Sequence, residues 1–188
     1  MTRTIVTGGD SGVGRATAIA LAREGHDVAI TYRSDADGAS QTAAEVEELG
    51  VGPPRVHQLD LAEPHRIPLV LNDMISDLGG LDAVVNNAGT MHQAPALEHT
   101  LEDWQQVIDV DLTGCFLVAQ QAAQHMAESD GGHIINVTSV HEHIPLPNAI
   151  AYSAAKAGMG LVSKVMALEL GDRGYGSTPS RPERSRPR

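Results

Sequence analysis

The chain of 188 residues has little cysteine, lysine or aromatic character, and it has no long apolar run. Its single cysteine, Cys115, excludes an intramolecular disulfide, and we expect a small buried thiol in a cytoplasmic protein. Without a membrane-length apolar stretch or an N-terminal signal peptide, we expect no membrane partner. The net charge of −11 argues against a nucleic-acid partner for the body of the chain.

Short apolar segments alternate with longer amphipathic ones, and the length suits one domain with a sizeable core. Strands are predicted at 4–6, 28–32, 56–59, 83–85 and 134–137, and helices at 15–24, 36–49, 68–78, 100–128 and 152–170. Strands that alternate with crossover helices predict a doubly wound, parallel α/β sheet of the Rossmann type. Thr100 is the predicted N-cap of the longest helix, with Asp103 as its capping partner.

A glycine-rich turn follows the first predicted strand. Glycines there let the backbone approach a pyrophosphate, and the next helix adds unpaired N–H groups and a positive dipole end. The alternative is a plain strand-to-helix turn, which also favours glycine. Gly8, Gly12 and Gly14 are predicted to cradle the pyrophosphate. The cofactor-binding residues predicted in this turn are Gly8, Asp10, Ser11, Gly12, Val13 and Gly14.

The second predicted strand ends in Tyr32, Arg33 and Ser34. An NAD-selective site usually carries an acidic residue at this point for the ribose hydroxyls. A guanidinium and a hydroxyl suit a 2′-phosphate better, so we expect NADP(H), with NAD(H) as the alternative. The other reading is that Arg33 is a solvated loop arginine.

Tyr152 and Lys156 lie four residues apart, which places them one turn apart on one helix face. A phenol ionises near pH ~10, and an adjacent ammonium lowers that pKa into the range of a useful acid/base. Ser139, which precedes them, has a hydroxyl suited to hold the reacting oxygen. This set suits reversible carbonyl reduction, with the hydride supplied by a nicotinamide. Taken alone, a tyrosine and lysine at this spacing are more often a solvated surface pair.

From Thr4 to Gly174 the chain resembles the short-chain dehydrogenase/reductase family. The glycine turn matches the family's motif, and Asn86, Asn87, Ala88 and Gly89 match its N-N-A-G segment. The resemblance implies an oxidoreductase that interconverts an alcohol and a carbonyl, active as a dimer or tetramer through its long helices. It implies Ser139, Tyr152 and Lys156 as catalytic residues. It implies cofactor contacts from Asp60, Leu61, Asn87, Ala88, Gly89, Tyr152 and Lys156.

Residues 139–147, Ser-Val-His-Glu-His-Ile-Pro-Leu-Pro, resemble a segment of bacterial glucose 1-dehydrogenases. This branch implies a sugar substrate, although the 3-oxoacyl reductases are close relatives and leave a 3-oxoacyl substrate open. His141 and His143 flank Glu142, but no clear third ligand lies nearby in the sequence, so we expect no metal site.

Asp111 departs from the family pattern, because many members have asparagine there. In the family its backbone carbonyl, within a kinked helix, is thought to hold a water in a proton relay to the lysine. If only the backbone acts, Asp111 is tolerated at this catalytic position. If the side chain matters, its carboxylate alters the charge state of Lys156.

A larger departure begins at Tyr175. The segment 175–188 has three prolines, four arginines and no apolar periodicity, so we expect a disordered basic tail after a domain of residues 1–174. The family instead continues with a buried strand and a P-G turn. Codons for this segment, read in another frame, are able to spell R-V-N-A-V-A-P-G-A-I-T-T-P. We therefore expect a frameshift product, truncated after the helix that carries Tyr152 and Lys156.

Two other interpretations follow from that segment. The first is a catalytically inactive, nucleotide-binding remnant that lacks the strand closing over the nicotinamide. The second is a genuine basic tail that binds an acidic partner and makes the protein an interaction module.

Overall fold

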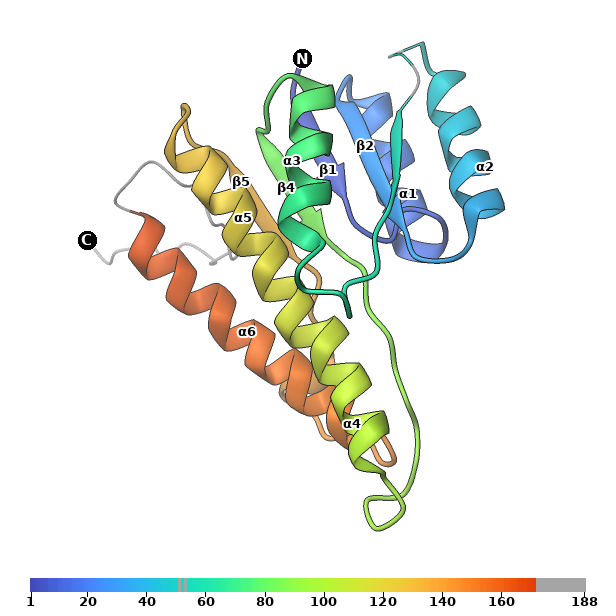
Figure 1. The fold of residues 1–188 in the computed structure, drawn as a ribbon, viewed down its shortest axis with the longest axis vertical. Coiled ribbons are helices and arrows are strands. Elements are labelled where there is room, and N and C mark those ends of the chain that lie inside the picture. The colour runs from blue at the N-terminus through green and yellow to red at the C-terminus, as the bar shows by residue number, and fades with distance from the viewer. Residues whose placement is uncertain (51, 53, 172–188) are drawn as a thin grey trace, which may run out of the picture.

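The computed structural model describes residues 1–50, 52 and 54–171, and its centre is a parallel sheet (Figure 1). The five strands follow the order β3-β2-β1-β4-β5, and every neighbouring pair is parallel. This topology confirms the predicted doubly wound α/β fold of the Rossmann type. The strands are β1 (Arg3–Val6), β2 (Asp27–Tyr32), β3 (Arg55–Gln58), β4 (Ala83–Asn86) and β5 (His133–Asn136).

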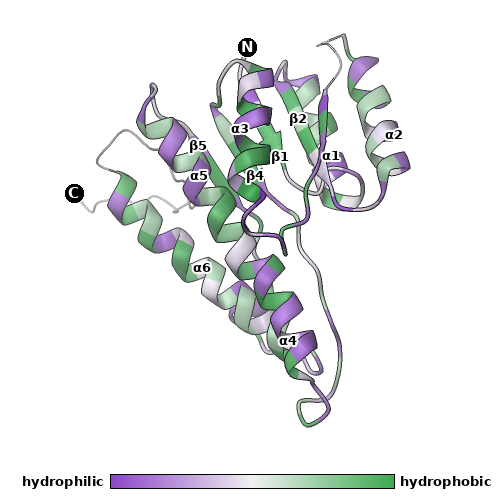
Figure 2. Cartoon of the chain, in the orientation of Figure 1, coloured by the Kyte–Doolittle hydropathy of each residue, from purple (hydrophilic) through white to green (hydrophobic). Residues whose placement is uncertain are grey.

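Helices cover both faces of this sheet. Ile5 and Val84 pack in a core with α3, α5 and α6, whereas Val6 and Val85 pack in a second core with α1 and α2. Successive strand residues point to opposite faces, so both faces need apolar cover, and Figure 2 shows hydrophobic strands at the centre. The helices are α1 (Gly12–Arg23), α2 (Ala36–Glu47), α3 (Ile67–Leu78), α4 (Leu101–Ile108), α5 (Cys115–Ala127) and α6 (Ile150–Leu170).

The helix predicted at 100–128 is interrupted, which corrects the sequence-based expectation of one continuous helix. It begins as predicted, because the Thr100 side chain accepts a hydrogen bond from the Asp103 N–H at 3.1 Å. A π-helical segment, η1 (Asp109–Gly114), then separates α4 from α5. Gly114 lies so close to the chain at Leu61 that an added Cβ would stand 2.5 Å from the Leu61 carbonyl oxygen.

The first helix starts earlier than predicted, at Gly12 rather than Arg15. Gly12, Val13 and Gly14 therefore form its first turn, and their N–H groups belong to the unpaired donors of a helix N-terminus. This difference matters because the glycine turn and the helix start are one structural unit.

β5 pairs with β4 alone within the described residues, and Ile135 on this strand is half exposed. A short 3-10 helix, η2 (Val140–Glu142), leads from β5 toward α6 and contacts it. The predicted tail and the domain boundary at 174 lie outside the described residues. No helix in the described part of the chain is both long and apolar enough to span a bilayer.

Candidate functional site

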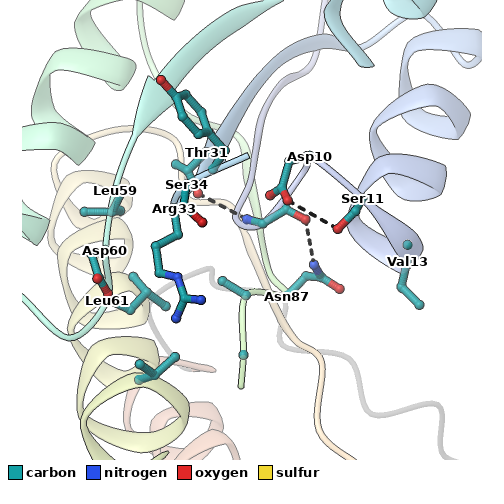
Figure 3. Close-up of a pocket in the computed structure, with 16 residues that line it drawn as sticks. Asp10, Ser11, Val13, Thr31, Arg33, Ser34, Leu59, Asp60, Leu61 and Asn87 are labelled. Atoms are coloured by element: carbon teal, nitrogen blue, oxygen red, sulfur yellow. Dashed lines mark hydrogen bonds between the residues drawn. The ribbon is translucent and has the colours of Figure 1, made fainter. Parts of the chain in front are cut away.

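A cavity of about 320 Å³ opens at the carboxyl ends of the strands, next to the β1–β4 pair at which the strand order reverses (Figure 3). In open α/β sheets this switch point is where ligands bind. All the predicted cofactor residues line it except Gly14, Tyr152 and Lys156. The lining residues are Gly8, Asp10, Ser11, Gly12, Val13, Thr31, Tyr32, Arg33, Ser34, Leu59, Asp60, Leu61, Asn87, Ala88, Gly89 and Val110.

Hydrogen bonds between the Gly8 main chain and two side chains hold the floor of this cavity. The Gly8 N–H donates to Thr31 Oγ1 at 3.1 Å, and Asn87 Nδ2 donates to the Gly8 carbonyl at 3.2 Å (Figure 3). Gly8 adopts a φ of 64°, a conformation that glycine reaches without strain. A Cβ on Gly14 would lie 1.9 Å from the Gly8 carbonyl oxygen. Gly14 therefore lets α1 approach the turn and does not itself line the cavity.

Two threonines that sequence reasoning did not assign to the site organise it. Thr7 is fully buried, and its Oγ1 accepts hydrogen bonds from the N–H groups of Asn87 and Ala88, at 2.9 and 3.0 Å. Thr31 holds Gly8. Their positions at strand ends could have predicted this role from the sequence, because the carboxyl ends of parallel strands meet at one edge of the sheet. Leu59 and Val110, also unassigned, line the same cavity.

The cavity has the features that a dinucleotide phosphate needs. Ser11 makes no side-chain capping bond to α1, and the first turn carries no acidic residue, so its N–H groups are available to an anion. The Asp10 carboxylate accepts a hydrogen bond from the Ser11 hydroxyl at 3.2 Å. In Figure 3 the Arg33 side chain extends across the cavity beside Leu61. The residues present therefore fit a nucleotide cofactor.

Beyond the cavity lies a buried ion pair. Lys156 Nζ stands 3.1 Å from Asp111 Oδ2, with the lysine side chain 6% exposed and the aspartate 0%. The other carboxylate oxygen of Asp111 accepts the Thr90 N–H at 2.6 Å. Burial raises the pKa of the Asp111 carboxyl, and the charge of Lys156 opposes that rise.

Tyr152 lies beside this pair on α6. Its ring centroid is 5.6 Å from Lys156 Nζ, as the spacing of four in a helix predicts. The half-buried ring packs against the buried side chain of Val107 in α4, together with Leu112. Asp111, Tyr152 and Lys156 are thus brought together by η1 and α6.

Ser139 is the N-cap of η2 and follows two residues after Val137, whose carbonyl lies 3.4 Å from Lys156 Nζ. Its Oγ accepts a hydrogen bond from the His141 N–H at 3.2 Å, which leaves the hydroxyl proton free to be donated. The two neighbouring histidines have separate contacts: His141 Nδ1 with the Ile144 carbonyl at 2.9 Å, and His143 Nε2 with Glu142 at 2.7 Å. No cluster of three metal-ligating side chains occurs in the part of the chain that the structure describes.

Comparison with known proteins identifies the family. The family model for short chain dehydrogenases matches residues 2–175, and the chain belongs to that family of NAD(P)(H)-binding oxidoreductases. Among curated proteins it is 48% identical over 167 residues to the uncharacterized oxidoreductase YohF of Escherichia coli K12, covering 88% of this chain and 66% of YohF. It is 36% identical over 173 residues to glucose 1-dehydrogenase 2 of Bacillus subtilis, covering 90% of this chain and 66% of that enzyme.

Solved structures agree with this assignment. The crystal structure of acetoin dehydrogenase YohF from Salmonella typhimurium superposes with a TM-score of 0.89 at 43% identity, covering 93% of this chain and 73% of that one. Acetoin dehydrogenase from Enterobacter cloacae gives a TM-score of 0.88 at 44% identity, covering 93% and 69%. The chain spans about two thirds of the length of the curated relatives it matches.

Proposed function

We propose that the protein is an NAD(P)(H)-dependent oxidoreductase that interconverts an alcohol and a carbonyl. The observation that carries this proposal is the position of Gly89. Gly89 lines the cavity, and a Cβ added to it would lie 3.3 Å from Lys156 Nζ. Lys156, one helical turn from Tyr152, therefore adjoins the cavity that fits the cofactor.

The cofactor would be held along the whole cavity. Gly8, Gly12 and the N-terminus of α1 would bind the pyrophosphate, with Asp60 and Leu61 near the adenine. Asn87, Ala88 and Gly89 would lie toward the nicotinamide, with Tyr152 and Lys156 on its ribose. Arg33 and Ser34 line the cavity at the end of β2, which favours NADP(H) over NAD(H). When bound, the nicotinamide supplies or accepts the hydride.

The side chains of this protein would transfer the proton to and from the reacting oxygen. The Tyr152 hydroxyl would donate a proton to the reacting oxygen during reduction and would take it back during oxidation. The Lys156 ammonium, beside the ring, would stabilise the phenolate. The Ser139 hydroxyl would donate a hydrogen bond to the same oxygen. Asp111 would stand at the proton-relay position.

The substrate would be a small molecule that carries an alcohol or a carbonyl. Relatives include glucose 1-dehydrogenase, acetoin dehydrogenase and 3-oxoacyl-[acyl-carrier-protein] reductase. The segment 139–147, next to Tyr152, favours a sugar, and we propose hydroxyketones such as acetoin and 3-oxoacyl thioesters as the other candidates.

Replacing Tyr152 tests this proposal. In the Tyr152→Phe variant we expect turnover with a panel of these substrates to fall by at least about 10²-fold, because the proton donor is lost. Binding of NADPH, followed by fluorescence, should persist. Ser153→Ala removes a hydroxyl from the next position of α6 and serves as the control. Retained turnover in Tyr152→Phe refutes the assignment, and cofactor binding without turnover in the parent favours the inactive remnant.

We also propose a homodimer or homotetramer in the cytoplasm. Leu161, Val165 and Leu168 lie on one side of α6 and are exposed by 63%, 44% and 81%, which supports a subunit contact there. The lone cysteine suits a reducing compartment. Light scattering on the purified protein measures the assembly, and a monomer at all concentrations contradicts it.

For residues 175–188 we retain the frameshift proposal. The match to the family model ends at residue 175, which supports a change of frame at this point. Resequencing the coding DNA past the codon for Leu170 tests it. If restoring one base yields V-N-A-V-A-P-G, the frameshift stands, whereas a sound frame favours the genuine basic tail.

A further inference from the structure

We propose that the side chain of Asp111 keeps Lys156 protonated inside a nearly water-free site. Tyr152 then remains the group that exchanges a proton with the reacting oxygen. The catalytic consequence rests on the proposed function, whereas the charge relation between Asp111 and Lys156 does not. Asp111 is on this view a positioning residue, which acts on the substrate only through its neighbours.

The contacts of Asp111 use both carboxylate oxygens. Oδ2 faces Lys156 Nζ at 3.1 Å, and Oδ1 is held by the Thr90 N–H at 2.6 Å. The carboxylate is therefore fixed in orientation and is completely removed from solvent. Burial alone disfavours a charged ammonium, and an adjacent carboxylate favours it. At Lys156 the carboxylate opposes the effect of burial.

Among residues 1–50, 52 and 54–171, the structure shows no comparable partner for Lys156. Its other contacts are the Val137 carbonyl at 3.4 Å and the Tyr152 ring. The carbonyl offers only a partial negative charge, and the ring attracts the ammonium only through its π face. In the residues that the structure describes, the Asp111 carboxylate is the one anionic group paired with Lys156.

The other ionisable groups nearby either are neutral or pair with residues other than Lys156. Cys115 in α5 faces the pair, but burial raises its pKa to about 12, so it stays a thiol at ordinary pH. Glu142 in η2 lies against Gly160 of α6 and pairs with His143. Asp109, in η1, accepts a hydrogen bond from Gln105 at 2.8 Å.

The loop after β4 is shaped around this pair. A Cβ on Gly89 would lie 3.0 Å from Asp111 Oδ2 and 3.3 Å from Lys156 Nζ, so a larger residue would crowd both charges. Asparagine at position 111 would keep the contact with Thr90 but would carry no charge. The carboxylate therefore adds an electrostatic function that the backbone relay alone does not need.

The lysine content of the chain makes a direct test simple. Its two lysines are Lys156 and the exposed Lys164, both on α6. Protein labelled with ¹³C at lysine Cε should give two resonances, and their change with pH reports each charge state. The parent, Asp111→Asn and the control Asp109→Asn are compared, with the Lys164 signal as an internal reference. Because this measurement needs no turnover, its outcome is independent of the proposed activity.

In Asp111→Asn we expect the Lys156 resonance to change from its charged to its neutral form at a lower pH than in the parent, relative to Lys164, and in Asp109→Asn we expect no such change. Circular dichroism checks that each variant is folded. If Asp111→Asn does not fold, Asp111→Ser replaces it with the same expectation. An unchanged midpoint in a folded Asp111 variant overturns the proposal, and so does an equal shift in Asp109→Asn.

Discussion

The two ends of the site are built from different interactions. At the glycine turn, which we call the phosphate end after the ligand proposed for it, Gly8 is held by Thr31 and Asn87. Helix α1 approaches Gly8 closely because Gly14 has no side chain. At the acid/base end, the arrangement depends on the charges of Asp111 and Lys156. Added volume should therefore damage the first end, whereas a change of charge should damage the second.

Loss of the lysine should have the largest effect. In Lys156→Met the Asp111 carboxylate stays buried without a countercharge, and we expect the free energy of unfolding to fall by about 3–5 kcal/mol near neutral pH. Urea unfolding measures this. Lys164→Met, which removes the other, exposed lysine of α6, should change little.

The same variant has a predictable pH dependence. Without Lys156, burial still raises the pKa of Asp111 above its unfolded value. The folded state then binds the proton more tightly, so stability should be lost as pH rises above about 4. Lys156→Met should also be partly rescued by Asp111→Asn. A destabilisation that is independent of pH, with no rescue, would contradict the electrostatic account of this end.

Added volume should break the phosphate end. In Gly14→Ala the new methyl group meets the Gly8 carbonyl, so the turn must shift at a cost of about 1–3 kcal/mol. We also expect weaker NADPH binding, by fluorescence titration. Gly171→Ala is the matched control, since a Cβ there meets no atom within 4 Å. Equal effects of the two variants would show that close packing at Gly14 is unimportant.

Replacing Arg33 tests the preference for NADP(H) over NAD(H) without changing the packing of the phosphate end. In Arg33→Ala we expect the affinity for NADPH to fall about tenfold, because a charge-assisted bond to phosphate is lost. The affinity for NADH should change little. Arg23→Ala, at the far end of α1, controls for general loss of positive charge. Equal losses for both cofactors would assign Arg33 a role unrelated to the 2′-phosphate.

The smallest expected effect on stability comes from the partly exposed ion pair of Arg3 and Asp82, which can be compared with the buried pair of Asp111 and Lys156. A side-chain hydrogen bond from Arg3 lowers the pKa of Asp82 to about 2. A folded-state pKa below the unfolded value stabilises the protein above about pH 4, and this contribution is lost as pH falls toward 2. Because both side chains are about a third exposed, solvent weakens the pair.

Asp82→Asn should flatten the decline in stability over that acid range, as measured by thermal unfolding at several pH values. Its effect at neutral pH should be much smaller than that of Lys156→Met. A loss as large as that of Lys156→Met would contradict the distinction between exposed and buried pairs.

The order of strands and helices was predictable because apolar periodicity is local. Thr4–Val6 and the segments that follow show it directly, and the described strands and helices differ from the predicted ones mainly at their ends. The predicted cofactor residues follow strand ends, and a parallel sheet brings those ends together at one edge. Tyr152 and Lys156 needed only the helical spacing of four.

The sequence by itself therefore determined the fold class, the family and the cavity residues that lie near one another in the chain or at strand ends. Tertiary structure alone decided what distant segments meet. It interrupts the long helix at η1, forms the hydrogen bonds of Thr7 with Asn87 and Ala88, and pairs Asp111 with Lys156. These contacts depend on packing between elements far apart in the sequence. No local pattern of residues specifies which distant side chains will meet.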